Sequence, residues 1–90
     1  MTVPVATLET YVGVYELRPG FQNTIRLKDG HLTTQLTGQR AHALLAESET
    51  KFFLTDLNAQ IEFVRDANGR VTDLVMFQHG RSRKVPRVAG

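Results

Sequence analysis

Apolar and polar residues alternate along most of this chain, and short groups of turn-forming residues interrupt the alternation. A period of two places successive side chains on opposite faces, which is the pattern of a β-strand with one buried face. Turn residues, among them Pro19-Gly20, Asp29-Gly30 and Asn68-Gly69, recur at roughly 8–12-residue intervals, a spacing typical of sandwiches and barrels. The pattern therefore predicts an all-β fold made of short strands.

The alternation resolves into eight expected strands. They lie at residues 11–17, 21–27, 32–36, 40–46, 50–55, 61–63, 71–77 and 81–88. No crossover helix separates them, because only residues 5–10 show the spacing of a helical turn, so consecutive strands should pair antiparallel. A sheet of this size buries its apolar face and removes its exposed edges by closing on itself. We therefore expect one domain, residues 1–90 with a core at 8–88: an eight-stranded antiparallel up-and-down small β-barrel with a short N-terminal helical turn.

The alternation also predicts which side chains face the barrel interior. The apolar ones are expected to be Ile25, Leu27, Leu32, Leu36, Phe63, Val75 and Phe77. Four polar residues share these faces toward the strand ends: Asn23, Thr34, Asp73 and His79. An eight-stranded barrel is either filled by its own side chains or just holds one small ligand. The filled barrel is the default, and the alternative is a shallow ligand pocket at the barrel mouth, with Tyr11, Tyr15, Gln35, Gln78 and His79 as candidate ligand-binding residues.

Composition narrows the class of protein. The chain has 90 residues, of which 41% are apolar and 22% charged, so it is neither disordered nor long enough for a two-lobed enzyme. Cysteine is absent, which excludes a disulfide framework, a thiolate zinc site and a cysteine nucleophile. No apolar run approaches the roughly 20 residues that span a bilayer. The N-terminus lacks the segments of a signal peptide, so a free-standing chain would be expected in the cytoplasm.

Basic residues concentrate near the C-terminus, although the formal net charge is only +2. Arg81, Arg83, Lys84 and Arg87 lie in the last ten residues, which contain no acid. No aromatic residue lies among them to stack on bases, which argues against nucleic acid as a partner. We expect these residues to lie on a solvated final strand. The alternative is that they contact an acidic surface of a partner or another polyanion.

One short motif suggests catalysis. Ser48-Glu49-Thr50-Lys51 matches the Ser-x-x-Lys motif of serine β-lactamases, whose chemistry needs both residues at a helix N-terminus. Here the motif falls between two expected strands, so a polar turn explains it. The three histidines and the scattered acids show no metal-ligand spacing. We therefore expect no catalytic residues, no metal site and no cofactor.

The order of landmarks along the chain resembles the DUF3471 family, small β-barrel domains usually found C-terminal to serine β-lactamase-related hydrolases and peptidases. The landmarks are Leu8-x-x-Tyr11-Val12-Gly13-x-Tyr15, Lys28-Asp29-Gly30-x-Leu32, Gln35-Leu36-x-Gly38-Gln39, Phe52-Phe53, Ile61-Glu62-Phe63-x-x-Asp66-x-x-Gly69, Val71 to Met76 and Gln78-His79-Gly80. The resemblance implies a lipocalin-like barrel without catalytic residues of its own. It also implies a hydrolase catalytic domain as partner, in cis or in trans, and a periplasmic or extracellular location.

Two functions stay open at this point. The first is a non-catalytic accessory domain that packs on a serine-hydrolase domain or modulates it. The second is a stand-alone barrel that binds a small ligand. The sequence does not decide the oligomeric state, the ligand, the substrate of a parent enzyme, or whether the chain is an excised domain.

Overall fold

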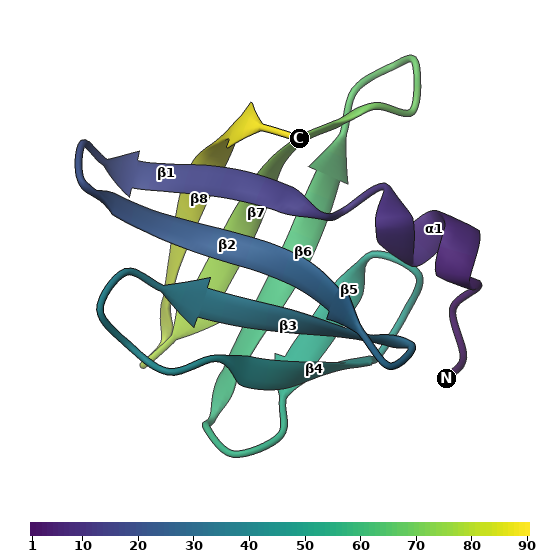
Figure 1. Ribbon diagram of the computed structural model, residues 1–90, viewed down its shortest axis with the longest axis horizontal. Helices are drawn as coiled ribbons and strands as arrows, with labels where there is room; N and C mark the ends of the chain where they lie inside the picture. The colour runs from purple at the N-terminus through teal and green to yellow at the C-terminus, as the bar shows by residue number, and fades with distance from the viewer.

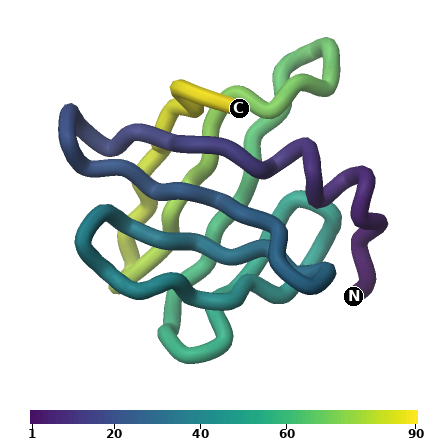
Figure 2. The backbone as a smooth tube through the Cα atoms, viewed as in Figure 1, coloured from purple at the N-terminus to yellow at the C-terminus, as the bar shows by residue number.

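Eight antiparallel strands form a closed barrel in the computed structural model, which describes residues 1–90 (Figure 1). Each strand pairs with its neighbours in sequence, and the first also pairs with the last. The elements are α1 (Val5–Glu9), β1 (Gly13–Arg18), β2 (Phe21–Lys28), β3 (His31–Leu36), β4 (His42–Ala46), β5 (Lys51–Leu54), β6 (Ala59–Arg65), β7 (Val71–Gln78) and β8 (Arg81–Ala89). The backbone trace shows an uninterrupted meander (Figure 2). The expected fold class is confirmed.

The first expected strand begins two residues late because the helical turn continues past α1. The Tyr11 backbone N–H donates to the carbonyl of Leu8, so Tyr11 belongs to the turn and β1 starts at Gly13. Two other strands are shorter than expected: β4 begins at His42, and β5 is limited to Lys51–Leu54.

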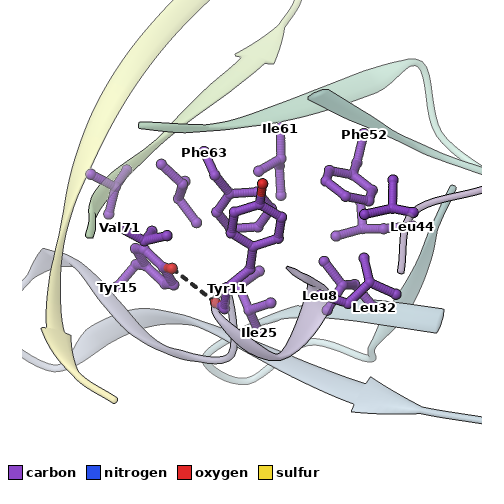
Figure 3. Close-up of a cluster of buried hydrophobic side chains, with 13 residues drawn as sticks. Leu8, Tyr11, Tyr15, Ile25, Leu32, Leu44, Phe52, Ile61, Phe63 and Val71 are labelled. Atoms are coloured by element: carbon purple, nitrogen blue, oxygen red, sulfur yellow. Dashed lines mark hydrogen bonds between the residues drawn. The ribbon is translucent and has the colours of Figure 1, made fainter. Parts of the chain in front are cut away.

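The core is a cluster of thirteen buried hydrophobic residues, and aromatic rings lie at its centre (Figure 3). The ring of Tyr11 stacks on Phe63, with centroids 4.2 Å apart and planes 7° from parallel. Phe52 meets both rings edge-on, at 5.8 Å from Tyr11 and 5.7 Å from Phe63. Stacked and edge-to-face aromatic pairs stabilise a core by about 0.5–1.5 kcal/mol beyond the burial of their area. The turn after α1 thus contributes the central ring of the barrel core.

The N-terminal segment closes one end of the barrel. Leu8 and Tyr11 are buried among the strands, and the Tyr11 hydroxyl donates to the main-chain carbonyl of Glu49 at 2.8 Å. The Arg65 guanidinium donates to the same hydroxyl at 2.5 Å. We call this end, with α1 and the loops at 29–30, 47–50 and 66–70, the closed end. The opposite end, formed by the turns at 19–20, 37–41, 55–58 and 79–80, is the open end.

The predicted interior positions of Asp73, Val75 and Phe77 on β7 are wrong. Arg65 pairs with Val71 while Val64 pairs with Asp73, so Thr72 is an extra residue in β7. Such a β-bulge shifts every later side chain to the opposite face. Interior positions are consequently taken by Leu74, which is fully buried, and Met76. Asp73, Val75 and Phe77 alternate with Leu74 and Met76 along β7, and they therefore point outward.

The barrel closes along a seam between β1 and β8. Only Val14 with Ala89 and Tyr15 with Arg87 are register partners, and a shift lies between the two pairs. Arginine side chains supplement this short ladder. Across the seam, Arg87 donates to the carbonyl of Val12 at 2.5 Å and Arg83 to that of Leu17 at 2.6 Å. Arg87 also donates to the carbonyl of Val71 on β7 at 3.3 Å.

Candidate functional site at the open end of the barrel

A small pocket of about 90 Å³ enters the barrel at its open end. Residues of β2, β3, β4, β5, β6 and β7 line it together with two loop residues. They are Asn23, Thr34, Leu36, Gln39, His42, Leu54, Leu57, Ala59, Gln60, Ile61, Met76, Phe77 and Gln78. A compact pocket with apolar walls and a few convergent polar groups is the usual form of a ligand site.

Asn23 and Thr34 form a buried polar pair in the pocket. Both lie on inward-facing positions of neighbouring strands, and their exposed fractions are 0% and 5%. The Thr34 hydroxyl donates to Asn23 Oδ1 at 2.6 Å. The Asn23 amide nitrogen reaches only the thioether sulfur of Met76, at 3.9 Å. Because sulfur is a weak acceptor, this buried amide donor is poorly satisfied within the protein.

A histidine–carboxylate pair borders the same pocket. His42 Nδ1 lies 2.9 Å from Asp56 Oδ1, and Arg40 forms a salt bridge with the other carboxylate oxygen at 3.1 Å. Arg40 is largely exposed, whereas the His42 side chain is mostly buried. The Asp56 contact fixes the imidazole ring and occupies one of its two nitrogens.

The predicted pocket residues do not come together, and the placement of two of them at a mouth is wrong. Tyr11 and Tyr15 are both fully buried at 0% exposure, toward the closed end and in the core. The Tyr15 hydroxyl donates to the carbonyl of Tyr11 at 2.8 Å (Figure 3). Burial raises the pKa of Tyr15 to about 12, and it also raises that of Tyr11, where the Arg65 charge opposes the shift. Both rings therefore act as core side chains with a polar tip.

Of the other predicted residues, only Gln78 lines the pocket. Gln35 lies between the inward-facing Thr34 and Leu36, so it points outward, where it accepts from Arg26 at 2.6 Å and donates to the Gln39 carbonyl at 2.9 Å. His79 lies in the turn after β7 with a φ of 55° and is exposed.

The prediction missed His42 and Gln39 as pocket residues. The signal for His42 was present, because it alternates in phase with the buried Leu44 on β4. Gln39 belongs to a loop, for which strand alternation carries no information.

The basic residues of β8 separate to different parts of the barrel. Arg81 pairs across the sheet with Gln78, and Arg83 pairs with Met76, so both belong to the open end. Arg83 donates to the carbonyl of Leu17 at 2.6 Å. Arg87 lies at the closed end in the β1–β8 seam, and Lys84 points outward next to Val75.

Ser48 has a structural position in the loop before β5. Its hydroxyl oxygen accepts the backbone N–H groups of Lys51 at 3.0 Å and Thr50 at 3.4 Å. The Lys51 amine lies over the Phe77 ring, 5.0 Å from its centroid, on the outer surface of the sheet. The serine therefore stabilises a turn, and the lysine of the motif is engaged elsewhere.

The structure brings together no group of three or more histidine, cysteine, aspartate or glutamate side chains suited to a metal ion. The one helix, α1, has five residues and is too short to cross a membrane.

Comparison with known proteins agrees with the order of landmarks in the sequence. Residues 1–85 match a family described as "Domain of unknown function (DUF3471)". The chain is also 26% identical over 85 residues to penicillin-binding protein 4* of Bacillus subtilis strain 168. That match covers 94% of this chain but 19% of the relative, so the chain spans about a fifth of that protein. Since the family match extends over nearly the entire barrel, the chain belongs to the DUF3471 family.

Proposed function

We propose that this barrel is a non-catalytic accessory domain of a serine β-lactamase-related hydrolase or peptidase, which packs on the catalytic domain in cis or in trans. Family membership and the similarity to part of a penicillin-binding protein support this association. The turn-stabilising contacts of Ser48 support a role without its own nucleophile. By the same association we place the domain in the periplasm or outside the cell, which fractionation of the source cells tests.

The observation that carries the proposal is an apolar pair on the outer surface of the barrel. Leu45 on β4 and Phe53 on β5 are direct cross-strand partners that face solvent, with exposed fractions of 38% and 36%. Leu45 and Phe53 also line a groove of about 330 Å³, together with Met1 and Val3. Large apolar side chains gathered at one place on a surface mark a site of protein contact.

Hydrogen exchange tests this packing surface. The amides of β4 and β5 are compared in the isolated chain and in the presence of the serine-hydrolase domain encoded in the same or an adjacent reading frame. We expect slower exchange at Leu45 and Phe53 in the complex, and loss of that protection in a Leu45→Ser/Phe53→Ser variant. Val88→Ser is the matched control, because Val88 is also an exposed apolar residue, at 52%, but lies on β8. Equal exchange with and without the hydrolase would overturn the proposal.

Activity assays test the non-catalytic role separately. The chain is incubated with chromogenic β-lactam, ester and D-amino-acid amide substrates, and we expect no turnover. Turnover that disappears in Ser48→Ala would show instead that the barrel is an enzyme.

A further inference from the structure

The open end of the barrel has a positive electrostatic character that the closed end lacks. Four arginines lie at or near it: Arg18, Arg40, Arg81 and Arg83. The acids near this end are Glu16 and Asp56, and the second of these is already paired with Arg40 and His42. At the closed end, by contrast, every loop contributes an acid. A rim with excess positive charge attracts anions to the pocket that it surrounds.

Arg81 is the cation of this rim that has no partner in the protein. Arg83 donates to the Leu17 carbonyl and Arg18 lies over the Phe21 ring, whereas Arg81 forms no salt bridge, side-chain hydrogen bond or cation–π contact. Its side chain is exposed and lines a neighbouring hollow that shares Gln78 with the pocket. Its cross-strand partner is Gln78, which lines the pocket. Directly paired residues of an antiparallel sheet have Cβ atoms about 4.5–5.5 Å apart, so one ligand group can contact both. The planar guanidinium matches the geometry of a carboxylate with two parallel hydrogen bonds.

The pocket is lined by neutral polar groups that can donate hydrogen bonds, and the carboxylate that borders it, Asp56, is already paired with His42 and Arg40. Deep inside, the Asn23 amide nitrogen has only the Met76 sulfur within reach, so a water molecule at the bottom of the pocket would satisfy it, and a ligand enters above that water. No aspartate or glutamate is among the lining residues. Between the donors, the walls are apolar side chains such as Leu36 and Leu54. The hydrogen-bond donors, the positively charged rim and the apolar walls together favour a small anionic ligand that carries a short apolar group.

The size of the pocket limits the ligand. A volume of about 90 Å³ corresponds to about three water molecules at their liquid volume, whereas drug-sized ligands need roughly 300–1,000 Å³. This volume accommodates a carboxylate with a short aliphatic chain and excludes a sugar or a nucleotide.

We propose that the open end of the barrel binds a compact aliphatic carboxylate, with the charged group between Arg81 and Gln78 and the aliphatic body against the pocket walls. This site is separate from the outer surface of β4 and β5 and does not depend on the packing of a hydrolase there. Two kinds of ligand carry such a carboxylate: a free short-chain acid and the C-terminal residue of a peptide.

NMR titration of the 90-residue chain tests the proposal. The Met76 methyl signal and the side-chain amide signals of Asn23 and Gln78 report on the pocket. The probes are butyrate and its neutral isostere butyramide, followed by an alanine-ended tripeptide with a free or an amidated C-terminus. For so small a ligand we expect a Kd on the order of 1–10 mM. Butyramide and the amidated peptide should bind at least about tenfold more weakly, because they lack the charge that Arg81 recognises.

Two variants sharpen the test. Arg81→Gln should weaken butyrate binding about tenfold, whereas Arg70→Gln, which removes an exposed arginine at the closed end, should leave it unchanged. Binding of butyrate but not of the peptide identifies a free acid as the ligand, and tighter binding of the peptide identifies a chain end. Equal affinities for butyrate and butyramide, or no saturable shift of Met76 up to about 100 mM, would refute the site.

Discussion

Replacement of Gly13 by alanine tests whether the seam between β1 and β8 limits the stability of the barrel. A Cβ atom at this position would lie 2.5 Å from the main-chain oxygen of Ala89 and 2.9 Å from Arg87 Nε. The first contact would have to lengthen by about 0.9 Å to reach the ordinary distance of 3.4 Å. Because the obstacle is backbone, no side-chain rotation relieves it, and β8 must move away from β1.

The seam between β1 and β8 contains few contacts that could compensate for such a movement. It contains only two register pairs, and the Arg87 contacts to Val12 and Val71 depend on the same alignment. Overpacking in a well-packed site costs about 1–3 kcal/mol, and a weakened ladder bond adds about 1 kcal/mol. We therefore expect the free energy of unfolding to fall by about 2–4 kcal/mol. For a domain of this size that lowers Tm by roughly 10–20 °C.

Urea and thermal unfolding followed by circular dichroism measure this effect, with two other glycines as controls. Gly80→Ala tests backbone conformation alone, because Gly80 has a φ of 72° and open space around it, so the expected cost is about 1 kcal/mol. Gly90→Ala meets only Arg87 Nη2 at 3.9 Å and should change nothing. If Gly13→Ala destabilised no more than Gly80→Ala, the argument that the seam is tightly closed would be wrong.

Three further perturbations test the closed end, the core and the bulge. Tyr11→Phe should lower the free energy of unfolding by about 1–2 kcal/mol in urea titrations, because Arg65 keeps only Glu49 as an acceptor and the Glu49 main-chain carbonyl loses its donor; an unchanged midpoint would contradict these hydrogen bonds. Since the pKa of Tyr15 is raised to about 12, the native state holds its proton above pH 10, where the unfolded state releases it. Stability should therefore be constant with pH below about 10 and fall by at most about 1.4 kcal/mol per pH unit for this group up to about pH 12. Unfolding curves at pH 9 to 12 measure this, and tyrosine ionisation at pH 10 in a still-folded protein would speak against it. Leu74→Ala should cost about 2–5 kcal/mol and Val75→Ala clearly less, and the reverse order in thermal unfolding would place the bulge elsewhere.

The polar residues of the pocket illustrate how far the sequence leads toward a site. Asn23 and Thr34 were expected on inward faces near strand ends, and the structure confirms both positions. Alternation assigns a face but not a depth, which is why Tyr11 and Tyr15 were expected at a mouth although they fill the core. Whether Arg81 forms an ion pair likewise depends on which acidic residues lie near it in space, and the sequence does not specify these spatial neighbours.

The number of strands, their order and their antiparallel pairing could all be predicted from the sequence. These features follow from local properties, namely the period of two and the turn residues, and short connections force consecutive strands to be neighbours. The interior face of β7, the end that α1 closes and the end that stays open with excess positive charge are apparent only in the folded barrel. The reason is that barrel closure requires a particular stagger between strands distant in sequence. The effect of the extra residue Thr72 appears only when β7 pairs with β6, and that of the close approach at Gly13 only when β8 meets β1.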